Sequence, residues 1–118
     1  MDLSITTHHL DGGVVEISPR GEIDIETAHL VRDAVDQVLT TSRPAVIRID
    51  LWWVTFIDSV GIGTLVGAYH TAAVSGIRVV VVNPTEFVYR QLYISGLVGL
   101  FGSPRPRSGD AGEPEPVA

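Results

Sequence analysis

Residues 54–65 read Val54-Thr55-Phe56-Ile57-Asp58-Ser59-Val60-Gly61-Ile62-Gly63-Thr64-Leu65, an apolar run that ends in Asp-Ser and passes directly into a helical pattern. Serine is a favoured N-cap residue, because its hydroxyl accepts a hydrogen bond from a free N–H one turn further along the helix. The simplest interpretation of Ser59 is therefore a helix cap. The helix is predicted to run from about Ser59 to Ser75 and to stop at Gly76, which suits the C′ position.

Glycine occurs three times in this predicted helix, at Gly61, Gly63 and Gly67. Each glycine costs a helix about 0.8–1.0 kcal/mol relative to alanine, so something must favour small residues there. Gly63, Gly67 and Thr71 are spaced four apart and form one small-residue face. We expect close internal packing at Gly67. At Gly61 and Gly63, one turn from Ser59, the close approach of a partner molecule is an equally good explanation.

The spacing of apolar residues alternates along the chain between a period of two, typical of strands, and a longer one, typical of helices. The pattern predicts strands at Leu3–Leu10, Val14–Pro19, Ala45–Leu51 and Ile77–Val82. It predicts helices after Asp24, at about Ser59–Ser75 and at about Glu86–Ser95. The order ββαβαβα requires crossover connections, and therefore an α/β fold whose mixed β-sheet has parallel pairs and is packed by about three to four helices. The run from Ile77, β-branched on both faces, is predicted to be a central strand.

The composition limits the function as strongly as the pattern limits the fold. The chain has 118 residues, the size of one domain, and 45% of them are apolar and 19% charged, which is a globular balance. All eight basic residues are arginines, and the net charge of −6 disfavours binding to nucleic-acid phosphates. Without lysine or cysteine the chain can form no Schiff base, P-loop lysine contact, thiolate metal site or disulfide.

Neither a secretory signal nor a membrane-spanning segment is expected, because the N-terminus is acidic and the apolar run at Ile77–Val82 is short. We therefore expect a cytoplasmic protein with no membrane partner. Residues 102–118 contain four of the chain's seven prolines and little that can be buried, which predicts a flexible tail. The folded domain is accordingly expected to span residues 1–101.

No arrangement of residues in the chain is typical of a catalytic site. The glycines after Ser59 lack the G-x-G-x-x-G spacing, and no glycine stands two residues before Ser59 as a nucleophile elbow requires. No histidine is placed as a base for a serine nucleophile. The neighbours His8 and His9 point to opposite faces of a strand, so they are poor joint metal ligands. We therefore expect no catalytic residue, no metal site and no cofactor.

Four motifs, in order along the chain, resemble those of the STAS family, in particular the small bacterial anti-sigma factor antagonists. They are Gly21-Glu22-Ile23-Asp24-Ile25-Glu26-Thr27-Ala28, then Ile49-Asp50-Leu51 with residues 54–63, then Val82-Asn83-Pro84, and finally Ser95-Gly96-Leu97. The resemblance covers most of residues 10–101 and implies a single STAS-like domain. It also implies that Ser59 is phosphorylated, with Asp24 close to it in the fold. A second serine often follows in the family, but Val60 stands there, so the acceptor is unambiguous.

The resemblance further implies a partner, and a regulatory role without catalysis. In the family, the partner is an anti-sigma factor with a histidine-kinase-like ATPase fold, which is also the serine kinase. The unphosphorylated chain is expected to bind this kinase and so free a sigma factor, while phosphorylation of Ser59 abolishes binding. A phosphate adds about −1.5 to −2 charge at a helix N-terminus, beside carboxylates that a docked partner would also face. The expected partner-binding residues are Asp24, Asp58, Ser59, Val60, Gly61, Ile62, Gly63, Trp52 and Trp53.

The pair Trp52-Trp53 departs from the family pattern, which has small or polar residues there. Adjacent residues of an extended chain point to opposite sides, so at least one indole is expected to be exposed. One interpretation is structural, with one ring packed against a helix and the other covering a loop. The other interpretation is an aromatic anchor for a partner, because tryptophan is enriched at interaction hot spots.

Two other functions stay open on the sequence. The chain can be a STAS scaffold or regulatory subunit, in a stress-signalling assembly or beside a lipid transporter's ATPase, and would then need no phosphorylation. It can instead be a module that binds a nucleotide or small anion at the helix N-terminus near Ser59. We rank this last function lower, because the chain has no lysine and the neighbouring carboxylates repel anions.

Overall fold

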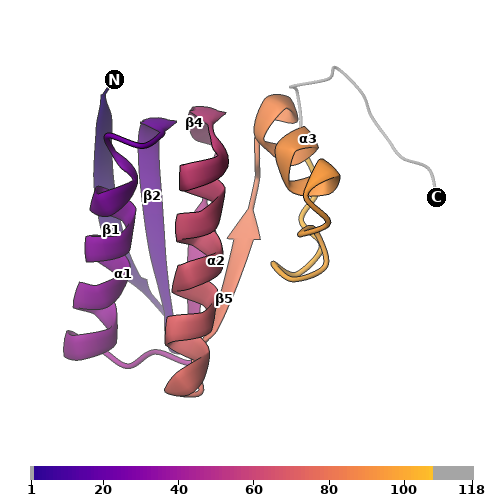
Figure 1. The fold of residues 1–118 in the computed structure, drawn as a ribbon. Helices are drawn as coiled ribbons and strands as arrows, with labels where there is room; N and C mark the ends of the chain where they lie inside the picture. The colour runs from indigo at the N-terminus through magenta and orange to yellow at the C-terminus, as the bar shows by residue number, and fades with distance from the viewer. Residues whose placement is uncertain (1, 108–118) are drawn as a thin grey trace.

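The computed structural model describes residues 2–107 and has the expected α/β architecture (Figure 1). Its elements, in chain order, are β1 (Leu3–Leu10), β2 (Val14–Ile23), α1 (Ala28–Thr41), β3 (Val46–Asp50), β4 (Trp53–Ile57), α2 (Ser59–Val74), β5 (Arg78–Val82) and α3 (Glu86–Ile94). The order is ββαββαβα, and the five strands form one sheet. No helix among residues 2–107 is long and apolar enough to cross a membrane.

The strand β4 is missing from the sequence prediction, which placed only one strand between the first two helices. Two strands lie there because the chain turns at Trp52, between β3 and β4. The N–H of Trp52 donates to the Asp50 carboxylate at 3.1 Å, and the N–H of Val54 donates to the carbonyl of Leu51 at 3.1 Å. The apolar and polar residues stop alternating at the two tryptophans, so the sequence pattern does not mark this turn.

The sheet is organised around β2, which pairs with three other strands. β1 runs antiparallel to β2 over its whole length. On the other side, β2 pairs in parallel with β3 as far as Ile17 and with β4 from Arg20 onward. Pro19 lies between these two pairings, where its missing N–H costs no ladder hydrogen bond. The strand therefore continues to Ile23, and the predicted end at Pro19 is wrong.

The strand β5 lies at one edge of the sheet and pairs only with β3 among the described strands, so the prediction that it is central is wrong. One face of β5 packs in the core, and the other face is covered by the segment that follows α3. Val79 and Val81 are buried in the core, while Val80 lies beside Gly102 on the segment that follows α3. This segment also covers the edge of β5, because the N–H of Val81 donates to the carbonyl of Phe101 at 3.1 Å.

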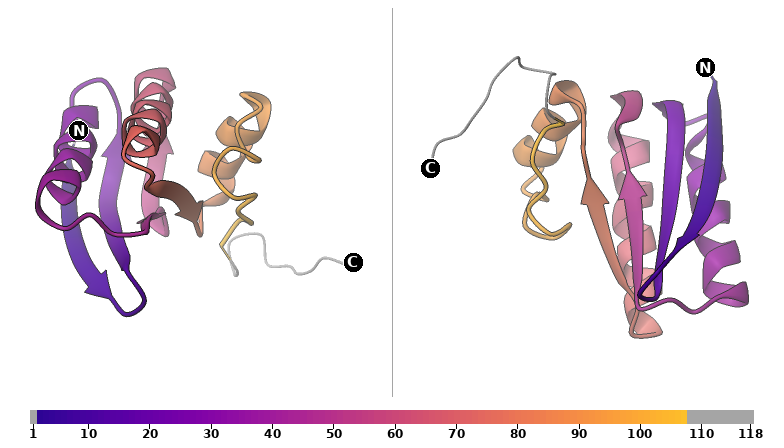
Figure 2. Two further views of the ribbon diagram at one scale, coloured as in Figure 1. Left: turned by 90° about the horizontal axis from the view of Figure 1, so that it is seen from below. Right: turned by 180° about the vertical axis from the view of Figure 1, so that it is seen from behind.

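Helices α1 and α2 cover one face of the sheet, and α3 lies at the β5 end, against β4 (Figure 2). The core between these layers is built from β-branched and leucine side chains of the strands and from the inner faces of the helices. Its largest fully buried members are Phe101, Ile17, Ile23, Ile47, Ile49, Leu51, Ile57, Leu65, Leu92, Val31, Val35 and Val54. The layers bring the first turns of all three helices to one end of the molecule (Figure 1).

Residues 102–107, which the sequence predicts to belong to a flexible tail, lie against the domain. The N–H of Arg107 donates to the carbonyl of Pro84 at 2.8 Å. The Arg107 guanidinium donates to the carbonyl of Trp52 and lies 5.3 Å from the centre of its ring. The folded part therefore extends beyond the predicted boundary at residue 101, because Arg107 finds specific partners on it. Residues 108–118, the rest of the predicted tail, lie outside the described residues.

Candidate functional site

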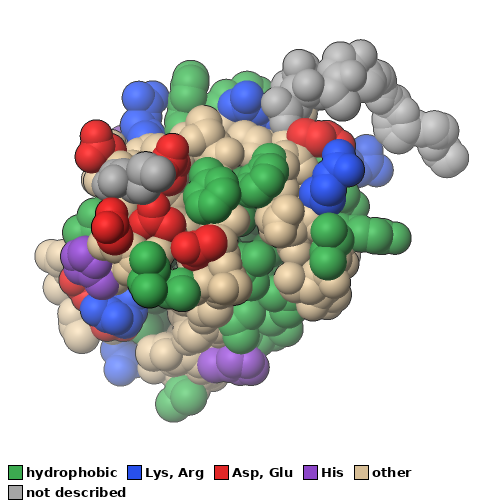
Figure 3. Space-filling view, turned by 45° about the horizontal axis from the view of Figure 1, so that its top comes forward, with side chains coloured by type: hydrophobic (Ala, Val, Ile, Leu, Met, Phe, Trp, Pro, Cys, Tyr) green, Lys and Arg blue, Asp and Glu red, His purple; other side chains and the backbone are tan. Residues whose placement is uncertain are grey.

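The candidate site lies where α1, α2 and α3 begin, at the top of Figure 1. The chain enters these helices from the carboxyl ends of β2, β4 and β5. In open α/β sheets, the crevice outside the carboxyl ends of the strands is the usual place for binding. Figure 3 shows this end turned toward the viewer, with hydrophobic side chains gathered next to acidic ones.

The N-cap of α2 is Asp58, so the interpretation of Ser59 as the cap is wrong. Asp58 has extended backbone angles, and its carboxylate accepts a hydrogen bond from the N–H of Gly61 at 2.8 Å. Aspartate and serine are similarly good caps, and an Asp-Ser pair does not say which one serves. Ser59 is instead the first residue of α2 and is exposed, so its hydroxyl faces solvent at the positive end of the helix.

Asp58 also joins the entrance of α2 to the loop between β2 and α1. Its second carboxylate oxygen accepts from the N–H of Ile25 at 3.1 Å, and its own N–H donates to the carbonyl of Ile23 at 3.2 Å. The residues on either side of Asp24 are thus bonded to the neighbour of Ser59. One carboxylate holds two loops together that are distant in sequence.

Asp24 is only 7% exposed, and its carboxylate serves the turn that starts α1. One of its oxygens accepts from the N–H groups of Glu26 at 2.9 Å and Thr27 at 3.1 Å, while the N–H of Asp24 donates to the Thr27 hydroxyl at 2.9 Å. The Thr27 hydroxyl donates in turn to the carbonyl of Glu22 at 2.6 Å. Asp24 therefore acts on the site by fixing the shape of this loop from beneath the surface.

The three glycines of α2 have different surroundings. Gly61 is buried, and a Cβ there would lie 2.6 Å from the carbonyl oxygen of Ile23 and 2.7 Å from Cγ1 of Ile57. Gly61 is thus required by internal packing against the end of β2. Gly63 and Gly67 are exposed, and a Cβ at either would meet no atom within 4 Å. The predicted internal packing at Gly67 is therefore wrong.

Three exposed aromatic residues lie on β4 and in the first turn of α3, and we call Trp53, Phe56 and Phe87 the aromatic strip. Their exposed fractions are 50%, 38% and 41%, and the rings of Phe56 and Phe87 stack with centroids 5.5 Å apart. Trp53 pairs with Arg20 and Phe56 with Glu22, so Thr55 is an extra residue in β4. This bulge turns Phe56 to the same face as Trp53. The sequence does not predict the roles of Phe56 and Phe87, because a bulge leaves no signature in the alternation and the stacking of Phe87 joins two separate elements.

The two tryptophans have different environments, as the sequence predicts for adjacent residues. Trp53 is exposed, and the Arg20 guanidinium lies 4.6 Å from the centre of its ring. Trp52 is half-buried, and it is the residue on which Arg107 rests. The prediction that at least one indole is exposed is confirmed. The loops at this end carry Asp24, Glu26 and Asp58 and no basic residue, so the surface around Ser59 is acidic (Figure 3).

The model of the STAS domain family matches residues 6–111 of this chain. The chain belongs to the STAS domain family. The anti-sigma-B factor antagonist of Listeria monocytogenes is 33% identical to this STAS domain over 97 residues, 82% of this chain and 84% of the relative. The anti-sigma F factor antagonist of Paenibacillus polymyxa is 31% identical over 97 residues, 82% of each chain. A crystal structure of an anti-sigma factor antagonist from Mycobacterium paratuberculosis has a TM-score of 0.79 and 29% identity, and the match covers 93% of this chain and 91% of that one. The resemblance predicted from the motifs, and the fold that it implies, are confirmed.

A groove of about 460 Å³ runs between α1 and α2 of this STAS domain. The α2 wall of the groove consists of small or apolar residues, namely Val60, Gly63, Thr64, Gly67, Ala68 and Thr71. The α1 wall is partly charged and consists of Arg32, Val35 and Asp36. The groove starts at Val60, the residue after Ser59. It therefore continues the candidate site along the exposed side of α2.

Replacing Asp58 with alanine is expected to lower the free energy of unfolding of the STAS domain by about 2 kcal/mol. The variant loses the α2 cap, worth about 1 kcal/mol, and leaves the N–H of Ile25 without its acceptor. Asp58→Asn keeps one carbonyl oxygen and is expected to lose about half as much. Urea unfolding followed by circular dichroism measures both. Equal stability of Asp58→Ala and the unaltered protein would contradict this role.

Proposed function

We propose that this STAS domain is an anti-sigma factor antagonist whose unmodified form binds an anti-sigma factor serine kinase with a histidine-kinase-like ATPase fold. Binding frees a sigma factor, and phosphorylation of Ser59 ends it. The observation that carries the proposal is Ser59 itself, exposed at the first position of α2, with the cap provided by Asp58. The names of its relatives support the same role. The domain acts in the cytoplasm as substrate and inhibitor of the kinase and has no catalysis of its own.

The start of α2 suits a phosphate on Ser59. The first N–H groups of a helix have no partner within the helix and carry partial positive charge. Asp58 takes the N–H of Gly61, and the N–H groups before it point to the same end. The loops around Ser59 are held by the hydrogen bonds of Asp24 and Asp58. We therefore expect the fold to change little when Ser59 is phosphorylated.

The same phosphate is expected to repel the partner. It would add about −1.5 to −2 charge to a surface that already carries Asp58 and Glu26. Like charges brought together across an interface cost several kcal/mol. The phosphate would also add bulk beside Val60 and Gly63, where a partner can approach α2 closely. The partner surface that fits the unmodified site is apolar at its centre and basic around it.

The predicted binding residues divide into two groups by burial. Asp58, Ser59, Val60, Ile62, Gly63 and Trp53 are at least partly exposed, and we assign them to direct contact together with Phe56 and Phe87. Asp24 and Gly61 are buried, and we assign them the role of holding the surface in shape. For Trp52 we favour the structural interpretation, because it is half-buried and its carbonyl also accepts a hydrogen bond from Arg107. Trp53 is the better aromatic anchor.

The function is tested by capture from an extract of the producing cells, with the Ser59→Ala variant as bait. We expect an ATPase of the histidine-kinase-like class among the bound proteins. This purified ATPase, given ATP, should phosphorylate the unaltered chain on Ser59 and leave Ser59→Ala unmodified. Stable binding without any phosphorylation would instead support the STAS scaffold. Absence of such an ATPase, together with specific nucleotide binding by the isolated chain, would support the anion-binding module.

Replacing Trp53 or Phe56 with alanine is expected to weaken binding to the kinase at least tenfold, about 1.4 kcal/mol, because both rings are exposed on β4, the strand that leads into Ser59. Tyr93→Ala is the matched control, since this tyrosine is 67% exposed on α3 and lies outside the aromatic strip. Isothermal titration calorimetry measures the three affinities. Equal losses for all three variants, or none for any, would remove the aromatic strip from the interface.

A further inference from the structure

The outer edge of β1 is unpaired in the part of the chain that the structure describes, because β2 is its sole neighbour there. The carbonyl of Asp2 accepts a hydrogen bond from the N–H of Glu22 at 3.1 Å. Backbone groups of alternate residues point to opposite edges of an antiparallel strand, so the even-numbered residues of β1 face β2. The N–H and C=O groups of the odd-numbered residues therefore point outward, and these residues are Leu3, Ile5, Thr7 and His9.

This edge lacks the devices that usually prevent strand pairing. Residues Leu3–Leu10 contain no lysine, proline, glycine or acidic residue, and β1 pairs with β2 without a bulge. Protected edges normally carry at least one of these features. The strand is also an uncharged strip, apart from its two histidines, on a chain with a net charge of −6. Two copies of this acidic chain would therefore meet with least repulsion along β1.

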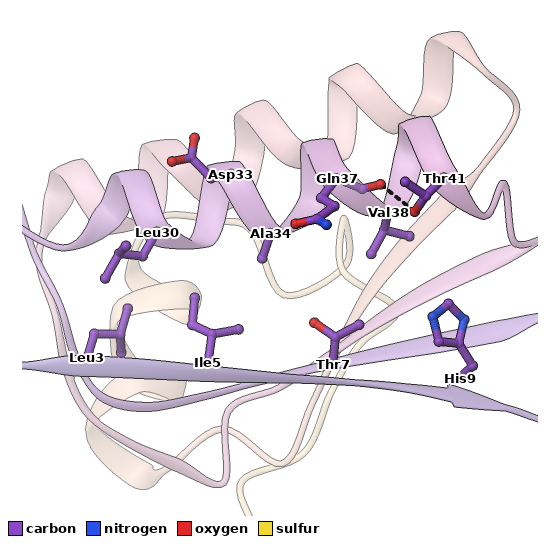
Figure 4. A pocket seen from close by; sticks show the side chains of 10 residues that line it. All are labelled: Leu3, Ile5, Thr7, His9, Leu30, Asp33, Ala34, Gln37, Val38 and Thr41. Atoms are coloured by element: carbon purple, nitrogen blue, oxygen red, sulfur yellow. Dashed lines mark hydrogen bonds between the residues drawn. The ribbon is translucent and has the colours of Figure 1, made fainter.

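A cleft of about 540 Å³ lies between β1 and α1, directly inside this edge. Figure 4 shows the side chains of Leu3, Ile5, Thr7 and His9 pointing from the strand toward α1 across an open space. The helix contributes Leu30, Asp33, Ala34, Gln37, Val38 and Thr41 to the opposite wall. A strand added to the edge would direct alternate side chains into the mouth of this cleft. The site thus offers backbone pairing and apolar contact together.

We propose that β1 pairs with β1 of a second copy of this chain, in antiparallel orientation, to form one continuous sheet across a two-fold axis. Opposed residues of an antiparallel pair must both point their backbone groups toward the partner, or both point them away. An odd-numbered residue must therefore oppose an odd-numbered one. This condition places the two-fold axis perpendicular to the sheet, with both α1 helices on the same face.

The register follows from the same condition. When Thr6 faces Thr6 of the second copy, Leu3 opposes His9 and Ile5 opposes Thr7. All outward N–H and C=O groups of both strands then have partners. A shift of the centre to Thr7 or Ile5 leaves outward groups at one end of each strand unpaired. In the centred register, no two residues of β1 with formal charges of the same sign face each other.

The surface that such pairing covers is small. β1 is about 27 Å long, and the sheet and helix layers are about 10 Å apart, so each copy would cover a few hundred Å². Interfaces of this size are typical of weak association, so we expect a dissociation constant in the micromolar range or above. Helix α2 begins at the end of the molecule where β1 begins (Figure 1), and Ser59 is its first residue. Antiparallel pairing would therefore place the two Ser59 sites at opposite ends of the dimer, both free to meet a kinase.

The register is tested with single cysteines, since the chain has none of its own. Thr6 would form a non-hydrogen-bonded pair with its counterpart, with Cα atoms about 4.5 Å apart, which is within the range for a disulfide. We expect oxidised Thr6→Cys protein to form a disulfide-linked dimer on a non-reducing gel. Thr71→Cys, at an exposed position on α2, is the control and should stay monomeric. Equal cross-linking of the two variants would overturn the proposed pairing.

Association itself is tested by sedimentation equilibrium over a range of concentrations. We expect the mass of the unaltered chain to rise toward that of a dimer, and Thr7→Lys to weaken this association at least tenfold. Thr71→Lys adds the same charge away from β1 and should leave association unchanged. Circular dichroism of both lysine variants shows whether the fold is kept. A monomer mass at all concentrations up to the millimolar range would overturn the proposal. Binding of a different strand or peptide to the edge of β1 would not restore it.

Discussion

The Ser59→Asp variant is expected to bind the anti-sigma factor kinase at least tenfold more weakly than the unaltered STAS domain, while Ser59→Ala keeps the full affinity. Ser59 is exposed and does not cap α2, so its hydroxyl can be lost without cost to the fold. A carboxylate at this position adds a charge beside Asp58 and Glu26, where the partner must dock. A tenfold loss corresponds to about 1.4 kcal/mol. The phosphoprotein, with about twice the added charge, should lose at least tenfold more.

The control for this experiment is Ser75→Asp, because Ser75 is exposed at the other end of α2. It adds the same charge about 24 Å from Ser59, beyond the screening length at physiological salt. Surface plasmon resonance at several salt concentrations measures the affinities of all three variants. We expect the loss in Ser59→Asp to shrink as the salt concentration rises. Equal affinity of Ser59→Ala and Ser59→Asp for the kinase would refute the switch.

The Gly61→Ala variant is expected to lower the free energy of unfolding by about 1–2 kcal/mol. The new Cβ would lie 2.6 Å from the backbone oxygen of Ile23 and 2.7 Å from a side-chain carbon of Ile57, which is buried. Neither neighbour can move freely, so α2 must shift away from the sheet. Overpacking of this kind typically costs about 1–3 kcal/mol, which exceeds the gain of about 1 kcal/mol in helix propensity. Thermal and urea unfolding measure the difference.

Gly63→Ala is the matched control, since the same substitution in the same helix meets no atom within 4 Å. It is expected to stabilise the domain by about 0.8 kcal/mol and to raise the melting temperature by a few degrees. If Gly63 allows the partner to approach α2, this more stable variant should nevertheless bind the kinase more weakly. A gain in stability without a loss of affinity would place Gly63 outside the interface. Equal stability of the two alanine variants would refute the internal role of Gly61.

The parts of the site that the sequence predicts correctly depend on residues close together in the chain. The Asp-Ser pair after an apolar run marks the start of α2 within one residue, because capping is a property of a single turn. Asp58 rather than Ser59 is the cap, and its carboxylate is also held by another loop. The N–H of Ile25 on that loop donates to the second carboxylate oxygen of Asp58. Likewise, the spacing of Gly61 and Gly63 marks both as unusual. Only the position of β2 shows that the first is packed inside and the second is open.

The aromatic strip and the strand order show the same division. The sequence predicts that one of Trp52 and Trp53 is exposed, because neighbours in an extended chain point to opposite sides. The bulge at Thr55 then decides that Phe56 shares the face of Trp53, and α3 brings Phe87 against it. Pro19 ends the predicted strand on local grounds. Proline is tolerated at this position because, on the side of β2 away from β1, it falls between the pairing with β3 and the pairing with β4.

By itself, the chain of residues determined the α/β class, the STAS motifs and the position of Ser59 at the head of a helix. These follow from composition, periodicity and capping, which act over a few neighbouring residues. Only the tertiary structure determined that Asp58 joins two loops, that Gly61 is closed in while Gly63 is open, and that the edge of β1 is unpaired. Each of these depends on contacts between segments far apart in sequence, and such contacts leave no local pattern to read.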